Sequence, residues 1–360
     1  TGWSPDRLLG SVHRSSWDDQ AFSLPFPARH GKIAVPVQSA RQVLALRGIA
    51  PKRFDVRVGM GFAGQITRLR PSTPGSRWTY ASLGEEHNTA PGQLSAATLL
   101  HARTQHQNRL QLLALVGGPQ IAASPGVKVY NTIFTQRDLQ YQYANLVVSD
   151  PSDPALVLEG FCVGGGSVTM PCKEAAAQLA DHLDPHARAT GSVNTLRRLS
   201  NGRWEGWNTD AQSFLELARQ LPAGTRALIL GRGATARSAH YALSTRGIPI
   251  TTAARDPRGE DAIPWNRRHT VPWELLINCT PVGGQPDENP WSFPFPANAR
   301  AVWDLVLAER PTALVRNARE RALSVVDGVT FWTLQGALQM QHLTGQPITP
   351  RELTTAMGEP

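Results

Sequence analysis

Lys173, Asn194 and Asp210 lie within one short stretch of the chain, and their side chains could together carry out proton-transfer chemistry. The stretch reads GGGSVTMPCKEAA, then ATGSVNTLRR, then GRWEGWNTD. Reduction of a ketone by hydride needs a proton donor at the developing alkoxide, and a lysine held by a carboxylate can supply or orient that proton. An arbitrary lysine and aspartate more often form a weak surface ion pair. The spacing of the residues around them therefore decides the interpretation.

The residues around Lys173 predict that it lies at a strand-to-helix turn. Residues 167–170 have the composition of a short strand, Pro171 ends that strand, and the alanine-rich run at 174–180 begins a helix. The glycines at 164–166 allow the backbone to approach a ligand or another element closely. We therefore expect the Lys173 side chain at the end of a strand.

Three motifs in this stretch resemble shikimate dehydrogenase and its relatives. They are V-T-x-P-x-K-E-A from Val168, G-x-V-N-T from Gly191 and G-x-N-T-D ending at Asp210, and the resemblance runs in order from about residue 113 to the C-terminus. It implies that Lys173 and Asp210 form the catalytic dyad and that Asn194 binds substrate hydroxyls. The further substrate-binding residues that it implies are Ser124, Thr169 and Gln335.

The chain departs from this family at four positions. Where the family has S-x-S-P and then H-N, Ala122 replaces the first serine and Tyr130 replaces the histidine. Gly284 replaces a methionine after the T-P-V-G turn, and Leu307 replaces a tyrosine expected near the substrate. These departures leave open whether shikimate, quinate or an analogue is the preferred substrate.

A dinucleotide site is predicted after Asp210. A strand at 227–230 leads into G-R-G-A-T-A and a helix beginning near Arg237, which fits the fingerprint whose backbone amides face a pyrophosphate. Arg255 falls at the end of the next strand, where an arginine accommodates the 2′-phosphate of NADP, although the adjacent Asp256 would suit the ribose of NAD. NADP is therefore favoured. The predicted cofactor-binding residues are Gly231, Gly233, Ala234, Thr235, Ala236, Arg255, Thr280, Val282 and Gly328.

The first hundred residues predict parallel β/α units, with strands at 8–13, 31–36 and 54–58 and a helix at 42–46. The motifs S-V-H, K-I-A-V, M-G-x-x-G-x-x-T-R and T-A-P-G-Q resemble the second half of type I 3-dehydroquinate dehydratase. The resemblance implies that Lys32 is a Schiff-base nucleophile, that His13 is the general acid/base, and that Arg68 and Gln93 hold the substrate carboxylate. An imine at Lys32 would draw electrons from the carbon whose proton must leave.

A complete enzyme of that kind is a closed barrel of about 200 residues or more. Roughly half of that length precedes the dehydrogenase-like region, and an open half-barrel exposes sheet edges. We therefore expect a longer natural product or completion by a second chain. For these 360 residues alone we expect no dehydration of 3-dehydroquinate and no borohydride-trapped adduct on Lys32.

Composition excludes several other classes of protein. No run of about 18 apolar residues and no signal pattern occurs, so a soluble cytoplasmic protein without membrane contact is expected. The three cysteines have neither disulfide-framework nor metal-ligand spacing, so no metal is expected. The net charge of +8 could indicate a nucleic-acid partner, but the arginines are scattered, and anionic small molecules explain the excess of positive charge equally well. No nucleic-acid partner is expected.

We predict an α/β protein made of a partial (β/α) barrel segment followed by a two-lobed dehydrogenase. The predicted domains are a dehydratase-like segment at 1–110, a substrate-binding α/β domain at 111–212, a Rossmann-type NADP domain at 213–325 and C-terminal helices at 326–360 that return to the substrate domain. The predicted reaction is NADP-dependent reduction of 3-dehydroshikimate to shikimate by a monomer or homodimer. The alternative is a ligand-sensing relative, similar to the quinate-pathway repressors of fungi. A sensor needs no proton relay, so Lys173 and Asp210 favour the enzyme.

Overall fold

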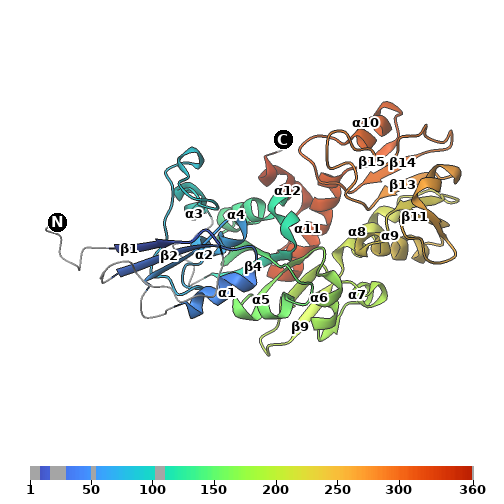
Figure 1. The fold of residues 1–360 in the computed structure, drawn as a ribbon. Helices are drawn as coiled ribbons and strands as arrows, with labels where there is room; N and C mark the ends of the chain where they lie inside the picture. The colour runs from blue at the N-terminus through green and yellow to red at the C-terminus, as the bar shows by residue number, and fades with distance from the viewer. Residues whose placement is uncertain (1–8, 17–29, 50–53, 102–109, 359–360) are drawn as a thin grey trace. The chain divides into compact units, whose positions relative to one another are not determined.

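The computed structural model describes residues 9–16, 30–49, 54–101 and 110–358 of the chain (Figure 1). The chain divides into two compact units, residues 1–179 with 196–204, and residues 180–195 with 205–360. Helices and parallel strands alternate in both, which confirms the predicted α/β class.

The first unit contains a small parallel sheet with the order β1-β2-β3. The strands are β1 (Leu9–His13), β2 (His30–Pro36) and β3 (Val56–Met60). Ile33 and Val35 of β2 pack into one hydrophobic cluster, and Ala34 packs into another with residues of β3, because successive side chains of a strand point to opposite faces. Within the described residues this sheet does not close into a barrel.

Short helices and 3-10 turns follow these strands. Ser39 caps α1 (Ala40–Ala45) by accepting a hydrogen bond from the Gln42 amide, so the helix begins two residues before the predicted start. The chain then forms α2 (Ile66–Leu69) and α3 (Ala96–His101). Short 3-10 turns occupy Leu46–Gly48, Phe62–Gly64 and Glu85–His87.

The first unit also contains three longer β/α repeats. Strand β4 (Gln111–Gly117) pairs in parallel with β5 (Tyr141–Val147) on one side and with β6 (Gly165–Val168) on the other. The carboxyl ends of β4 and β6 therefore lie side by side, so the loops that follow them meet at one edge. The helices after the three strands are α4 (Gly126–Gln136), α5 (Pro154–Gly160) and α6 (Lys173–Leu179), and the unit also includes most of β8 (Thr195–Arg198).

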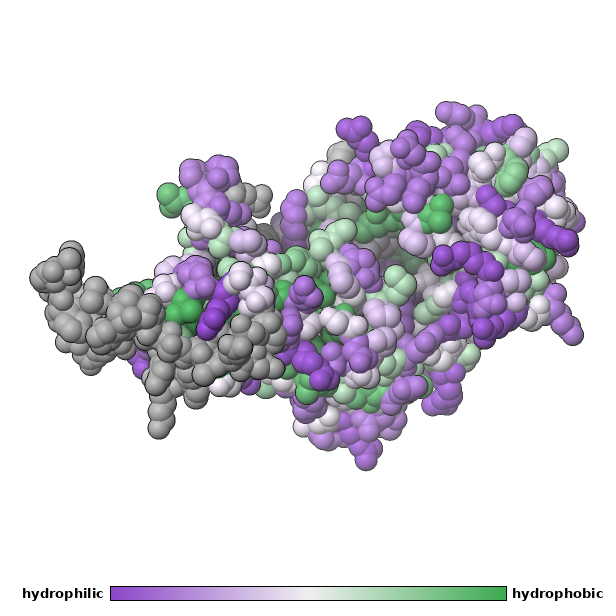
Figure 2. Space-filling model, viewed as in Figure 1, coloured by the Kyte–Doolittle hydropathy of each residue, from purple (hydrophilic) through white to green (hydrophobic). Residues whose placement is uncertain are grey.

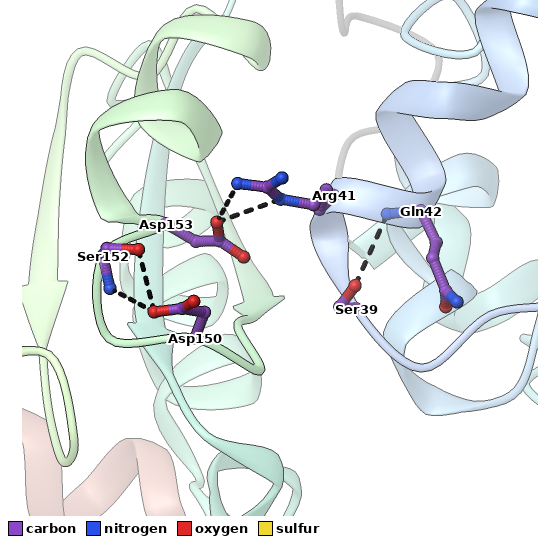
Figure 3. Close-up of polar contacts among 6 residues, drawn as sticks. All are labelled: Ser39, Arg41, Gln42, Asp150, Ser152 and Asp153. Carbon is purple, nitrogen blue, oxygen red and sulfur yellow. Dashed lines mark hydrogen bonds and ion pairs between the residues drawn. The ribbon is translucent and has the colours of Figure 1, made fainter.

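An ion pair joins the dehydratase-like segment to the repeat that contains α5 (Figure 3). The Arg41 guanidinium in α1 donates from Nε and Nη2 to Oδ1 of Asp153, at 3.0 and 2.5 Å. The Asp153 side chain is 3% exposed, and although this residue is the N-cap of α5 its carboxylate makes no capping bond. Leu44 of α1 also lies against Gly160 at the end of α5. The buried carboxylate thus depends on an arginine from the dehydratase-like segment.

Replacing Arg41 with alanine is expected to lower the melting temperature by a few degrees, because Asp153 then keeps a buried charge without its cation. The double variant Arg41→Ala/Asp153→Asn should recover most of that loss. Arg77→Ala, which removes a more exposed pair with Asp55, is the matched control and should change the melting temperature less. Differential scanning calorimetry measures all three. Equal melting temperatures for wild type and Arg41→Ala would show that the Arg41–Asp153 ion pair does not contribute to stability.

The second unit contains a parallel six-stranded sheet with the order β12-β11-β10-β13-β14-β15. Strand order reverses at β10, and the two faces of the sheet are covered by separate hydrophobic clusters, as in doubly wound dinucleotide-binding folds. The strands are β10 (Ala227–Leu230), β11 (Ile250–Ala254), β12 (Ala262–Pro264), β13 (Leu275–Asn278), β14 (Ala301–Asp304) and β15 (Ser324–Val326).

Several helices of the second unit start at side-chain caps. Asn208 caps α8 (Thr209–Ala218), Asp327 caps α11 (Gly328–Thr344), and Thr349 forms a capping box at α12 (Pro350–Met357). The other elements of this unit are β7 (His182–Leu183), α7 (Pro185–Thr190), β9 (Trp204–Trp207), α9 (Ala234–Thr245), a 3-10 turn at Trp265–Thr270 and α10 (Ala313–Glu320).

The surface differs between the two units. All large hydrophobic side chains that are exposed among the described residues belong to the first unit, and they are Leu9, Trp78, Leu83, Leu100, Leu156 and Met170. The visible face of the region around α10 and β15 is predominantly hydrophilic (Figure 2). Over the part of the chain that the structure describes, no helix combines the length and hydrophobicity needed to cross a bilayer.

Candidate active site and cofactor-binding edge

In the first unit, the structure places Ser124 and Thr169 in the loops after β4 and β6, and Lys173 at the start of α6. Ser124 follows the 3-10 turn Pro119–Ala123, and its hydroxyl accepts a hydrogen bond from the Gly126 amide at the start of α4. The Thr169 amide donates to the carbonyl of Val116 in β4. These loops are adjacent, because a Cβ added at Gly117 would lie 2.5 Å from the Thr169 methyl group.

Lys173 is the first residue of α6 and is half-buried. It lies in the predicted turn between strand and helix, directly after the buried Cys172, whose thiol pKa burial raises to about 11. The helix dipole disfavours a cation at a helix start. The helix dipole therefore gives no stabilising reason for a lysine at this position.

In the second unit, Asn194 and Asp210 form a buried hydrogen-bond network with Thr209. The Asn194 Nδ2 donates to Asp210 Oδ1 at 2.8 Å and to the Thr209 hydroxyl at 2.9 Å, while its Oδ1 accepts from the Thr209 amide at 2.9 Å. Both Nδ2 hydrogens of Asn194 are thus donated in hydrogen bonds to other protein side chains. Asp210 lies in the first turn of α8, where the helix dipole favours a negative charge. Asn194 therefore orients the carboxylate, a role that sequence reasoning missed.

Helix α11 brings two glutamines near this network. Gln335, predicted to bind substrate, is 8% exposed and donates to the Trp332 carbonyl within its own helix. Gln339, one turn later, donates from Nε2 to the backbone carbonyl of Asn194 at 3.0 Å. The sequence offered no signal for Gln339, since its partner lies 145 residues away.

The turn after β10 has the features that a dinucleotide pyrophosphate requires. Gly231 adopts φ +102°, a backbone conformation that residues other than glycine rarely adopt. Gly233 is the N-cap of α9 and supplies no side-chain cap, so the first amides of this helix face outward from the turn. Helix α9 begins at Ala234, three residues before the predicted start. The residues present therefore fit a bound dinucleotide.

The T-P-V-G turn is held in shape by a buried network below it. Asn278, at the end of β13, accepts from the Thr280 hydroxyl at 2.7 Å and donates to the Val282 carbonyl and to Asp304 Oδ1, both at 2.9 Å. Asp304 also accepts a hydrogen bond from the Thr312 hydroxyl, and burial raises the pKa of its carboxyl. Thr280 and Val282 thus lie in a rigid turn at the same edge of the sheet as Gly231.

Arg232, inside the G-R-G turn, is a further charged residue that the sequence did not single out. Its Nη1 donates to Oδ2 of Asp256 at 2.7 Å and to the backbone carbonyl of the same residue at 2.9 Å. Arg258 also donates to Asp256, at 3.1 Å. Arg255 is exposed and has no hydrogen-bond partner among the described residues. Three guanidinium groups therefore lie on the turns that follow β10 and β11.

Gly328 begins α11 in contact with the loop after β14. A Cβ at this position would lie 2.2 Å from the Val306 carbonyl oxygen and 2.8 Å from the Leu307 nitrogen, so backbone packing alone requires glycine here. Val306 and Gly328 also line a cavity of about 480 Å³, which is bounded further by Arg310 and by residues of α10, α11 and α12 that include Arg319 and Arg351. Asn194, Asp210 and Gln335 do not line it.

In the dehydratase-like sheet, Lys32 and Arg68 are brought close together. Burial lowers the Lys32 pKa, and the nearby Arg68 charge lowers it further; the ammonium lies 4.7 Å from the centre of the Tyr80 ring. Arg68 is 3% exposed, donates to the Gly59 carbonyl at 2.7 Å, and has its pKa lowered to about 10 by burial. Ser11 lies opposite Lys32 in the sheet register, so His13 is on the same face two residues further along.

Gln93 is tied into its own loop. Its Oε1 accepts from the Thr89 amide and hydroxyl, at 2.8 and 2.9 Å. Gly92 lies against Gly61, where an added Cβ would meet the Gly61 carbonyl oxygen at 2.1 Å. The T-A-P-G-Q loop therefore packs on the M-G turn that precedes Arg68.

One departure from the dehydrogenase pattern, Tyr130, has a structural explanation. Tyr130, in place of the family histidine, is 2% exposed and packs edge-on against Tyr143 with ring centres 4.8 Å apart. The adjacent Asn131 exchanges hydrogen bonds with the Tyr143 backbone at both ends of its amide, at 2.9 Å each. Both residues therefore fasten α4 to β5. No cluster of three or more metal-ligating side chains occurs among the residues that the structure describes.

Two family models match the chain in the order that the motifs predicted. A model of type I 3-dehydroquinase matches residues 24–109, and a model of the shikimate dehydrogenase substrate binding domain matches residues 116–196. These matches confirm both resemblances.

Individual relatives agree with these matches. A shikimate dehydrogenase (NADP(+)) of Anaeromyxobacter sp. is 32% identical over 279 residues, covering 70% of this chain and 97% of the relative. A chloroplastic bifunctional 3-dehydroquinate dehydratase/shikimate dehydrogenase of Arabidopsis thaliana is 27% identical over 357 residues, covering 89% of this chain and 59% of that protein. The chain therefore spans nearly the full length of the first relative and part of the second.

Solved structures extend the likeness to the fold. The shikimate 5-dehydrogenase of Thermus thermophilus in complex with NADP(H) and shikimate superposes with a TM-score of 0.59 at 29% identity, covering 69% of this chain and 99% of the other. A chorismate mutase/shikimate 5-dehydrogenase fusion protein of Clostridium acetobutylicum gives a TM-score of 0.61 at 23% identity, covering 69% of this chain and 96% of the other.

Proposed function

This chain belongs to the shikimate dehydrogenase family, and we propose that it catalyses the NADP-dependent interconversion of 3-dehydroshikimate and shikimate. Bound NADPH would supply a hydride to the substrate carbonyl carbon. Gly231 and Gly233 would hold its pyrophosphate, and the arginines after β10 and β11 would hold its 2′-phosphate. The substrate is a small carboxylate, and we propose a cytoplasmic enzyme that acts as a monomer or homodimer.

In the proposed mechanism, Lys173 donates a proton to the alkoxide oxygen as the carbonyl becomes a hydroxyl. Asp210 would act with it as the carboxylate of the dyad. Ser124 would bind the substrate carboxylate, and Thr169 and Gln335 would bind other polar groups of the substrate. In the reverse direction the neutral lysine amine accepts the hydroxyl proton as hydride leaves.

The observation that carries this proposal is the buried Asn194–Asp210 hydrogen bond at the start of α8. It holds a buried carboxylate in one orientation at the start of a helix, where the helix dipole favours its charge. A binding protein that senses the same ligands has no need for a carboxylate fixed in this way.

The experiment is a spectrophotometric assay that follows NADPH absorbance, with shikimate or quinate as substrate and NADP or NAD as cofactor. Turnover with shikimate and NADP is expected to be the fastest of the four combinations. Turnover that is faster with quinate would reassign the substrate. No turnover with any combination would contradict the enzyme and favour the ligand-sensing alternative.

The dehydratase-like segment retains Lys32 and Arg68 in one place, so we propose that it derives from a 3-dehydroquinate dehydratase. We propose no dehydration by the described sheet itself, because its three strands do not close into a barrel within the described residues, whereas imine chemistry requires a site that surrounds the substrate.

A cofactor prediction follows from Arg255. Arg255→Ala should weaken NADP binding by about tenfold and leave NAD binding nearly unchanged, because only NADP carries the phosphate that a guanidinium fork can hold. Isothermal titration calorimetry with each cofactor measures the dissociation constants for NADP and for NAD. Equal losses for the two cofactors would place Arg255 away from the 2′-phosphate.

A further inference from the structure

One carboxylate holds two arginines at the edge where the cofactor ribose is expected. Oδ2 of Asp256 accepts from Arg232 Nη1 at 2.7 Å and lies 2.9 Å from Arg258 Nη2. Arg232 comes from the turn after β10, and Asp256 and Arg258 come from the loop after β11. The three side chains form a closed cluster in which a single oxygen carries both ion pairs.

The sheet register explains why these loops meet. Strands β10 and β11 run in parallel, and Leu230 at the end of β10 lies opposite Ala253 near the end of β11. The residues that follow each strand therefore share one edge, next to the N-terminus of α9. In folds of this kind, that edge holds the adenosine ribose, where an acid suits free hydroxyls and an arginine suits a 2′-phosphate. This chain places both kinds of residue there.

We propose that Asp256 is an internal competitor for the 2′-phosphate of NADP and thereby limits the preference of this protein for NADP over NAD. The proposal rests on the NADP assignment made above. When NADP binds, its phosphate takes the place of the Asp256 carboxylate on Arg232 and Arg258. When NAD binds, the carboxylate keeps both arginines and its second oxygen can accept from a ribose hydroxyl.

The exposure of the cluster makes this exchange feasible. The Arg232, Asp256 and Arg258 side chains are 43, 64 and 72% exposed, and exposed ion pairs are weak. A phosphate dianion offers more charge and more acceptor oxygens than a carboxylate, so it displaces Asp256 from the arginines. The displaced carboxylate stays nearby and repels the phosphate, which lowers the affinity for NADP below what the three arginines would otherwise provide.

The test uses Asp256→Asn in the full chain and two short probes, 2′,5′-ADP and 5′-AMP, titrated calorimetrically. The variant should bind 2′,5′-ADP about tenfold more tightly than wild type, while its affinity for 5′-AMP stays within about twofold. Asp287→Asn, which removes the same charge from an exposed aspartate without an ion pair among the described residues, is the matched control and should change neither affinity.

Each outcome decides the proposal. Unchanged affinity of Asp256→Asn for 2′,5′-ADP, or an equal gain in Asp287→Asn, would overturn it. Weaker binding of 2′,5′-ADP would also overturn it, because Asp256 would then orient the arginines for the phosphate rather than compete with it. If wild type and variant both bind 5′-AMP and neither binds 2′,5′-ADP, the NADP assignment itself fails, and that result is distinct from the others. Retained 5′-AMP binding also shows that the variant is folded.

Discussion

Replacing Lys173 with alanine is expected to lower kcat for shikimate oxidation by about 100-fold or more, with NADP affinity nearly unchanged. The reason is that the lysine acts on the reacting oxygen, whereas the cofactor contacts come from turns after β10, β11 and β13. Lys173 is the first residue of α6, so truncation at Cβ leaves the helix backbone intact. Steady-state kinetics and a calorimetric titration with NADP measure the two quantities.

Lys128→Ala is the matched control for this variant. Lys128 is an exposed lysine in α4 of the same unit, and its loss should leave kcat within about twofold. Undiminished turnover in Lys173→Ala would remove Lys173 from the mechanism. A large rise in KM with unchanged kcat would instead make it a binding residue.

Asn194→Ala is expected to have the second largest effect, and it should affect both catalysis and stability. The substitution removes two donors and one acceptor from a site that is 2% exposed, so the Thr209 amide and Asp210 each lose a hydrogen bond. Each buried group left unpaired costs about 1–3 kcal/mol, so the free energy of unfolding should fall by about 2 kcal/mol or more. Because Asp210 also loses its fixed orientation, kcat should fall by at least about tenfold.

Chemical denaturation and steady-state kinetics together distinguish this role from direct substrate binding. If Asn194 acts mainly by holding substrate hydroxyls, Asn194→Ala would raise KM while kcat and the free energy of unfolding stay close to wild type. Asn201→Ala, at an exposed turn where the amide oxygen accepts from the Arg203 backbone, is a suitable control for the loss of an asparagine and should lower stability less.

Much of the fold follows from local sequence rules. The strands around Ile33, Leu228 and Leu276 were predictable because short apolar runs bounded by glycine or proline favour buried parallel strands. Differences lie at the ends, as with α9, which begins at Ala234 rather than near Arg237. A helix can start at a glycine N-cap without any capping side chain, so the sequence carries no strong mark of that boundary.

The roles of the paired polar residues did not follow from the sequence. Arg41 and Asp153 are 112 residues apart, and Arg232 and Asp256 are 24 residues apart. Whether such side chains meet depends on which strands are neighbours and on their register, and neither is visible in a local pattern. For the same reason, the choice of Asn194 as a substrate ligand overlooked its hydrogen bond to Asp210.

By itself, then, the sequence determined the class of chemistry, since the K-E-A, V-N-T and N-T-D motifs and the G-R-G-A-T-A turn are short segments whose backbone conformation depends on nearby residues. The tertiary structure alone decided how these residues are used. The Asp256 carboxylate forms ion pairs with two of the three arginines at the cofactor edge. The Asn194 amide donates to Asp210 and so orients its carboxylate, and the close packing at Gly328 leaves no room for a side chain. Hydrogen bonds and ion pairs act over about 3 Å, so their partners are set by the packing of whole elements.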